Sequence, residues 1–111
     1  MPSSEEPFVT IVRAVAHPGK GPELIERLRE VVERDASEPG TLAQTIQVEQ
    51  GSPDVVWCYE VWAGEQALAD HRVNGADIRD RIAPLIAEPY QVITCMPLFG
   101  HGVDLAAMVG R

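Results

Sequence analysis

The stretch that organises this chain is Val-Val-Trp-Cys-Tyr-Glu-Val-Trp, residues 55–62. Its β-branched and aromatic side chains are typical of a largely buried strand. Side chains alternate along a strand, so the residues divide between two faces. One face is expected to carry Trp57, Tyr59 and Val61, and the other Cys58, Glu60 and Trp62.

Gly64 ends this strand, and the residues after it carry a helical pattern. Ala67, Leu68 and His71 share one stripe of that helix. The strand ends in Trp62, and a tight turn leads into a helix that aims His71 back at the sheet. Together these elements would give a pocket one wall and one titratable group. The same pattern also fits a packed core, in which His71 is only a hydrogen-bonded core residue.

The composition is that of one ordinary globular domain. The chain has 111 residues, of which 45% are hydrophobic and 23% charged. No apolar run approaches the roughly 20 residues that a membrane helix needs. Residues 1–7 are polar and acidic, the opposite of a signal peptide, so we expect a cytoplasmic location and a disordered leading segment.

The charge and the metal-binding residue types exclude several classes of partner. Seventeen acidic against nine basic residues give a net charge of −8, which repels nucleic-acid backbones and anionic lipid. We therefore expect neither nucleic-acid nor membrane binding. No Cys/His spacing typical of a metal site occurs, so we expect no metal and reduced thiols at both cysteines.

The first half of the chain predicts a strand, a helix and a second strand. Residues 8–16 are apolar on both faces except at Arg13, as in a central strand. Arg13 is either a solvated residue at an edge or a buried cation paired with a carboxylate such as Glu60. Pro22 opens an amphipathic helix that ends before Gly40, and residues 41–49 alternate as in a strand near a sheet edge.

The second half completes the pattern. Residues 50–54 are expected to form a hairpin loop before the strand of residues 55–62. A further helix is expected from about residue 76 to residue 87, with a kink at Pro84, and a fourth strand over residues 90–98. The Gly-punctuated tail, residues 99–111, is apolar enough to dock on a partner subunit.

The order strand, helix, strand, strand, helix, strand is the ferredoxin-like α+β arrangement, with helices on one face of a four-stranded antiparallel sheet. The strands bearing Cys58 and Cys95 are not neighbours in it, so we expect no disulfide. Too many apolar residues are present for all of them to face two helices. A second copy of the chain, packed sheet to sheet about a two-fold axis, would cover the other face and make a homodimer.

Several local motifs resemble one known family. They are Tyr59-Glu60-Val61-Trp62 with His71 nine residues on, Glu38-Pro39-Gly40 before the second strand, and the turn Pro18-Gly19-Lys20. Together they resemble the antibiotic biosynthesis monooxygenase domain family over residues 8–98. The resemblance implies a dimeric α+β barrel.

Members of that family that resemble quinol monooxygenases oxidise phenols, quinols or polyketide-type anthrones with O2, without metal, flavin or other cofactor. For this chemistry His71 is the natural base by residue type, because histidine has a reference pKa of about 6.5. Trp62 would form an aromatic wall or an N–H donor of the cavity. Further candidate substrate-binding residues are Tyr59, Asn74, Arg13, Tyr90 and Glu60, the last also being a candidate structural acceptor.

The chain also departs from parts of the family. Polyketide-oxidising members carry Asn and Tyr where this chain has Cys58 and Leu68, and haem-degrading members carry Asn and Trp where it has Val12 and His71. An isomerase or cyclase using the same cavity and His71 is an alternative, although no basic cluster that would receive a phosphate stands out in the sequence. A non-catalytic dimer that binds a small molecule is the third interpretation. The sequence names neither substrate nor product.

Overall fold

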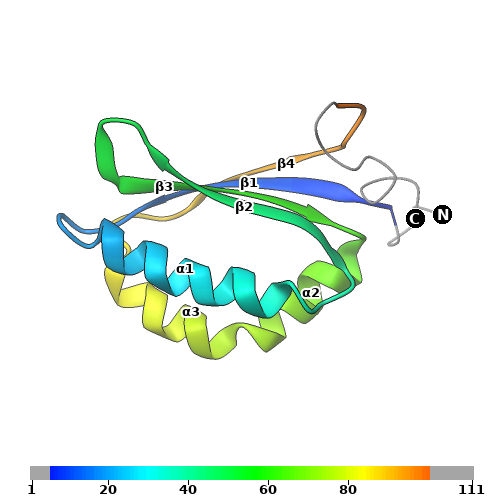
Figure 1. Cartoon of the computed structure of the whole chain (residues 1–111), viewed down its shortest axis with the longest axis horizontal. Helices are drawn as coiled ribbons and strands as arrows, with labels where there is room; N and C mark the ends of the chain where they lie inside the picture. Colours follow the sequence, from blue (N-terminus) through cyan, green and yellow to red (C-terminus); the bar gives the residue numbers. More distant parts are fainter. Residues whose placement is uncertain (1–5, 101–111) are drawn as a thin grey trace.

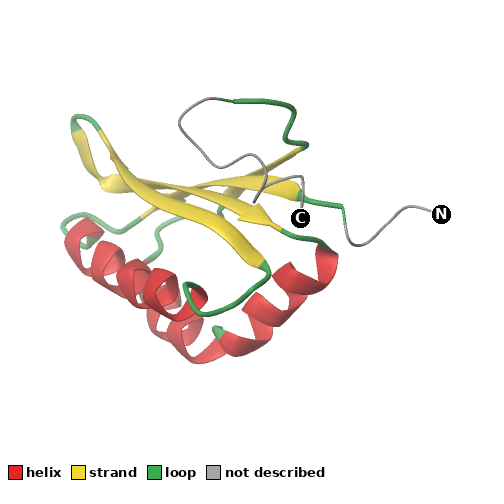
Figure 2. Cartoon of the chain, turned by 45° about the vertical axis from the view of Figure 1, so that its right-hand side comes forward, coloured by secondary structure: helices red, strands yellow, loops and turns green. Residues whose placement is uncertain are grey.

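The alternating strands and amphipathic helices assemble as expected into a two-layer α+β fold. A computed structural model describes residues 6–100 of the chain. Its elements are β1 (Phe8–Val15), α1 (Gly21–Asp35), β2 (Thr41–Glu49), β3 (Ser52–Trp62), α2 (Glu65–Asn74), α3 (Ala76–Ile82), the 3₁₀ turn η1 (Ala83–Leu85) and β4 (Gln91–Cys95). The strands form one antiparallel sheet in the order β2-β3-β1-β4. The helices cover one face of this sheet (Figures 1 and 2), which confirms the ferredoxin-like fold.

The two most apolar strands are central, as their sequences predict. β1 lies between β3 and β4, and β3 lies between β1 and β2. Cys58 and Cys95 therefore stand on strands that β1 separates, and both thiols are free. The core between sheet and helices is formed by Ala14, Ala16, Leu24, Val56, Ile78, Ile82 and Leu85.

Three boundaries differ from the expected ones. The β2–β3 connection is shorter than residues 50–54, because β3 begins at Ser52. The helix expected to reach residue 87 ends at Ile82, and Pro84 lies in the 3₁₀ turn that follows, since proline cannot continue an α-helical ladder. β4 ends at Cys95, three residues earlier than expected.

The turn before α1 is clamped onto β3 by a carboxylate. The backbone N–H groups of Gly19 and Gly21 donate to Asp54, at 3.0 Å to Oδ2 and 2.8 Å to Oδ1. Gly19 has φ +81°, a conformation that favours glycine. Gly21 lies so close to β3 that an added Cβ would be 2.0 Å from the Pro53 carbonyl oxygen.

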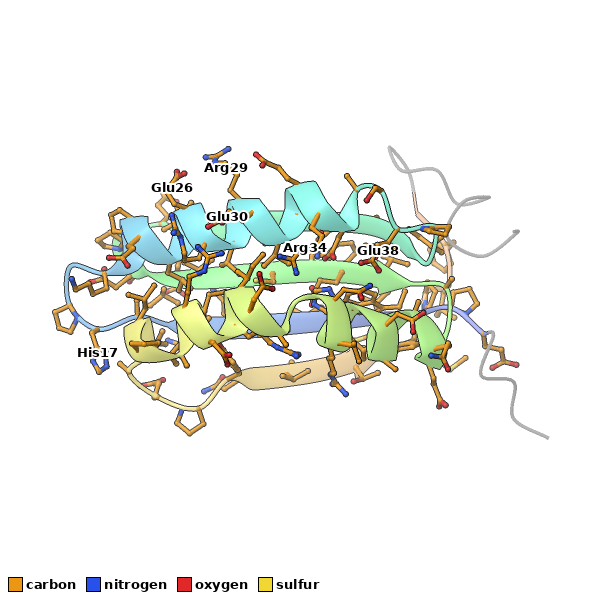
Figure 3. All side chains as sticks on the ribbon, turned by 90° about the horizontal axis from the view of Figure 1, so that it is seen from below. His17, Glu26, Arg29, Glu30, Arg34 and Glu38 are labelled. Atoms are coloured by element: carbon orange, nitrogen blue, oxygen red, sulfur yellow. The ribbon has the colours of Figure 1, made fainter. Side chains whose placement is uncertain are left out.

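Charged side chains on the helical layer join α1 to α3 (Figure 3). Arg81 lies 3.0 Å from Glu30, and Arg34 lies 3.1 Å from Asp77. These exposed pairs link the two helices, and each contributes little to stability.

The sheet face without helices carries a smaller apolar cluster. Val9 and Val61 are buried there, with Ile11 and Tyr59 packed beside them. On β4 and just beyond it, Ile93, Met96, Leu98 and Phe99 are exposed. Most of the expected leading segment, residues 1–7, and tail, residues 99–111, lie outside the described residues. No helix within residues 6–100 is both long and apolar enough to cross a bilayer.

Candidate functional site

A cavity of about 250 Å³ lies between the helices and the sheet, beside His71. Its inner wall comes from β1 and β3 through Thr10, Val12, Ala14, Cys58 and Glu60. The helices contribute Leu24, Leu28, Val31, Leu68, His71, Arg72, Arg79 and Ile82. Tyr90, just before β4, and Val92 on β4 complete the lining. Most of these side chains are apolar, and the few polar ones converge on the same hollow, as in small-molecule sites.

His71 is held from behind by a carboxylate. Its Nδ1 lies 2.9 Å from Asp35 Oδ2 and 3.1 Å from Oδ1. The Asp35 side chain is 2% exposed and that of His71 15%. The carboxylate can only accept, so Nδ1 carries the proton and Nε2 is the nitrogen left to accept one.

The Trp62 ring packs against the same imidazole. The two ring centroids are 4.8 Å apart, and the planes are tilted by 50°. Trp62 is fully buried and its indole N–H donates to Thr10 Oγ1 at 2.9 Å. Trp62 therefore supports His71 from the side and has no free donor for a ligand, and it is not among the residues that line the cavity.

A chain of buried hydrogen bonds continues from Asp35 across the sheet. Gln44 donates to Asp35 Oδ2 at 2.8 Å and to Glu60 Oε2 at 3.3 Å. The Thr10 hydroxyl donates to Glu60 Oε1 at 3.0 Å. The sheet register explains this arrangement, because Gln44 and Thr10 stand directly opposite Glu60 on the two neighbouring strands.

Glu60 therefore takes the place of a structural acceptor on the cavity wall. Both of its oxygens are hydrogen-bonded to uncharged donors. The pairing with Arg13 considered above does not form, because the two side chains project from opposite faces of the sheet. Arg13 pairs instead with Glu88 at 3.4 Å, and its guanidinium lies 6.0 Å from the centre of the Trp57 ring.

The other expected substrate-binding residues divide among three places. Tyr90 lines the cavity at its rim, where it is 48% exposed. Tyr59 lies on the face without helices, as does Arg13, since strand alternation sends both away from His71. Asn74 is at the end of α2, where it donates to Glu38 Oε1 at 2.9 Å instead of facing the cavity.

Sequence reasoning missed Asp35, although the sequence contains a signal for it. Asp35 continues the inward stripe of Leu24, Leu28 and Val31 at helical spacing. An acidic residue on a buried stripe, in the last turn of a helix, is opposed both by burial and by the helix dipole. Such a residue indicates a partner, which here is His71.

Sequence reasoning also missed Arg72 and Arg79, both of which line the cavity. The sequence showed no basic cluster that would receive a phosphate, and these two arginines did not stand out as one. Arg72 on α2 and Arg79 on α3 are seven positions apart across a helix break at Gly75, and only the fold brings them to one rim.

Two further titratable groups on the cavity wall are shifted toward their neutral forms. Burial and, to a smaller extent, the charge of Glu60 raise the pKa of the Cys58 thiol to about 12. Burial and the neighbouring Cys58 raise the pKa of the Tyr90 phenol, against a smaller opposing effect of Arg79. Cys58 is therefore a neutral wall residue near pH 7 and no nucleophile.

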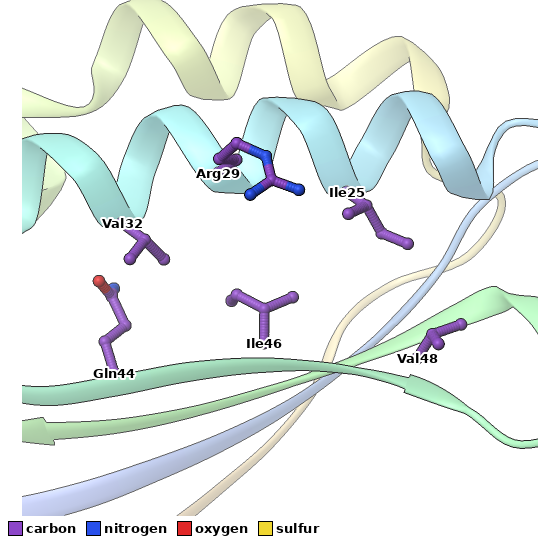
Figure 4. Close-up of a pocket in the computed structure, with 6 residues that line it drawn as sticks. All are labelled: Ile25, Arg29, Val32, Gln44, Ile46 and Val48. Atoms are coloured by element: carbon purple, nitrogen blue, oxygen red, sulfur yellow. The ribbon is translucent and has the colours of Figure 1, made fainter.

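A second hollow, about 340 Å³, lies between α1 and β2 (Figure 4). It is lined by Ile25, Arg29, Val32, Gln44, Ile46 and Val48. It is larger than the cavity at His71 but holds no acid–base pair, so its lining offers less chemistry. Within residues 6–100, no group of three or more His, Cys, Asp or Glu side chains is placed to hold a metal ion.

Comparison with known proteins gives one consistent family. The family model described as antibiotic biosynthesis monooxygenase matches residues 7–76. A solved structure from Nitrosomonas europaea, named as a candidate antibiotic biosynthesis monooxygenase, is 25% identical, with a TM-score of 0.80 over 92% of this chain and 100% of that chain. No curated protein sequence matches the chain.

Two more solved structures carry the same kind of name. One, from Chloroflexus aurantiacus, is 26% identical with a TM-score of 0.73, covering 88% of this chain and 99% of that chain. The other, from Bacteroides thetaiotaomicron, is 23% identical with a TM-score of 0.79, covering 92% and 98%.

Proposed function

Because the chain belongs to the antibiotic biosynthesis monooxygenase family, we propose that it is a cofactor-independent monooxygenase that acts on a small phenol, quinol or polyketide-type aromatic. One observation carries the proposal. His71 stands beside a largely apolar cavity, with Nδ1 held by buried Asp35 so that Nε2 can accept a proton. A cavity of roughly 150 Å³ is enough for a benzene ring, so about 250 Å³ accommodates one substituted ring.

The proposed reaction begins with proton transfer from the substrate hydroxyl to His71 Nε2. The carboxylate of Asp35 stabilises the imidazolium that forms, as a carboxylate does in other histidine-based sites. The apolar walls keep water away from the resulting aromatic anion, which raises its electron-donating power. The anion then passes one electron to O2.

The radical pair combines to form a C–O bond at a ring carbon that carries hydrogen. His71 returns its proton to the peroxide, and cleavage of the O–O bond with loss of the ring hydrogen releases water. One oxygen atom ends in the quinone and the other in water. The substrate itself supplies the electrons, so a phenol plus O2 gives a quinone plus water with no external reductant.

The remaining wall residues have supporting roles in this proposal. Glu60, Gln44 and Thr10 link Asp35 to Trp62 in one fixed network, which keeps the imidazole from rotating. Tyr90 is at the rim and, as a neutral phenol, can donate a hydrogen bond to a bound oxygen atom.

The test is oxygen uptake by metal-free protein with simple hydroquinones and anthrones. His71→Ala is expected to lower the rate by about 100-fold or more, because a positioned base contributes about 10²- to 10⁴-fold. His17→Ala is the matched control, since His17 is exposed in the turn before α1 (Figure 3). Equal uptake by His71→Ala and the parent would refute the assignment.

The same experiment separates the alternatives. An isomerase or cyclase that uses His71 would convert its substrate equally well without oxygen. A non-catalytic binder would show no conversion, yet a bound ligand would raise the melting temperature.

We also propose that the chain works as a homodimer in the cytoplasm. The apolar side chains of Ile93, Met96 and Leu98, on β4 and just after it, are exposed, and a second copy would cover them. Light scattering is expected to give twice the mass of one chain. A monomer at micromolar concentration would contradict the dimer without affecting the proposal for His71.

A further inference from the structure

Two arginines at the rim of the cavity beside His71 form no ion pair with a carboxylate of residues 6–100. Residues 6–100 contain seven arginines. Five of them form ion pairs with Asp or Glu: Arg13, Arg27, Arg29, Arg34 and Arg81. Within this part of the chain, the two without such a pair are Arg72 and Arg79, and both line the cavity.

This distribution is unexpected in so acidic a protein. With seventeen acidic residues against nine basic ones, a cation on the surface usually meets a carboxylate. The Arg79 guanidinium instead donates to the backbone carbonyl of Arg72, which draws its side chain across the α2–α3 break toward Arg72. Both arginine side chains line the same cavity.

The interior of the cavity has the opposite character. Glu60 lines the inner wall and Asp35 lies behind His71, and their oxygens are satisfied by His71, Gln44 and Thr10. An anion placed deep in the cavity would be repelled by these carboxylates, whereas an anion at the rim would meet two guanidinium groups. The cavity thus favours a ligand that is charged at one end only.

We propose that the ligand of this cavity is an aromatic compound bearing an anionic group, a carboxylate or a phosphate, that Arg72 and Arg79 hold at the rim. The inference deepens the proposed function, because it rests on the use of this cavity as the substrate site. The ring lies between the apolar walls with its hydroxyl toward His71, and the anionic group lies at the α2–α3 junction. Planar guanidinium groups suit both carboxylate and phosphate oxygens.

The test is calorimetric binding of three probes that cannot be oxidised by the proposed route: benzoate, phenyl phosphate and neutral benzamide. The parent is expected to bind at least one anion about tenfold more tightly than benzamide, with an advantage that shrinks as salt is added. Arg72→Gln and Arg79→Gln are each expected to weaken anion binding about fivefold and to leave benzamide binding within twofold.

Arg29→Gln is the matched control, because it removes the same charge from the opposite side of α1 and is expected to leave all three affinities unchanged. The relative affinity of benzoate and phenyl phosphate identifies the preferred anion. Equal or undetectable binding of anions and benzamide, or equal effects of the Arg29 and Arg72 variants, would overturn the proposal. If anion selectivity is present but no substrate supports oxygen uptake, the monooxygenase assignment fails and the anion site stands.

Discussion

Replacing Asp35 by asparagine keeps the size of the side chain but converts one carboxylate oxygen into an NH2 group. Both oxygens of Asp35 lie within 3.1 Å of His71 Nδ1, so the new NH2 group faces Nδ1 in either orientation. Gln44 donates to Oδ2 at 2.8 Å, which requires the asparagine oxygen to occupy that place. The NH2 group then stands where Oδ1 was and donates to Nδ1.

This hydrogen bond is expected to favour the other tautomer of the imidazole. With Nδ1 as acceptor, the proton of neutral His71 moves to Nε2, which can no longer take a proton from the substrate. The loss of a general base corresponds to about 10²- to 10⁴-fold in rate, or roughly 3–5 kcal/mol of activation free energy. Most hydrogen bonds survive, so the free energy of unfolding is expected to fall by only about 1–2 kcal/mol.

The assay is oxygen uptake together with nitrogen NMR of His71, which reports the tautomer directly. Asp70→Asn is the matched control, because Asp70 precedes His71 on α2 but is exposed and accepts a hydrogen bond from Gln66. Parent-like uptake by Asp35→Asn, or an unchanged His71 tautomer, would refute the reasoning and leave the Asp35 contact as structural.

Two further predictions concern the scaffold. The free energy of unfolding is expected to fall as pH rises from about 9 to 12, because the folded chain keeps the Cys58 proton and the unfolded chain releases it. The loss of stability is at most about 4 kcal/mol. In thermal melts over this pH range, Cys58→Val should show a shallower decline in melting temperature than the parent. Gly21→Ala is expected to destabilise the chain by about 1–3 kcal/mol in urea titrations, because the new Cβ would press on the Pro53 carbonyl oxygen. An unchanged urea midpoint would show instead that the turn before α1 can move freely away from β3.

The fold was predictable because apolar residues recur at strand or helix spacing along each long element. The strand of residues 55–62 and the amphipathic helix over residues 21–35 were identified from alternation and from the apolar stripe. The start of β3 was not, because Pro53 and Asp54 are typical of a loop. The pairing of β2 with β3 shifts register here, because Val48 pairs with Val56 but the next residue, Glu49, pairs with Ser52. Pro53 therefore lies outside the regular hydrogen-bond ladder, where its missing backbone N–H is tolerated.

The candidate site was only partly predictable. His71, Glu60 and Tyr90 could be placed near the cavity from helix and strand parity, because these are local rules. Arg13 and Tyr59 were assigned to the site by residue type, and parity alone would have put them with Trp57 on the other face. The contacts of Asp35 and the meeting of Arg72 with Arg79 depend on how helices pack together, which no short-range pattern encodes.

The proposed base, His71, is carried by the helix with the fewest buried residues. α2 has no fully buried residue, whereas α1 and α3 both insert apolar side chains into the core. Polar contacts hold its C-terminal end, where Asn74 bonds to Glu38 and His71 bonds to Asp35. For the proposed oxygenation, a helix anchored in this way is expected to open locally without unfolding of the sheet, which would admit the aromatic substrate and release its product.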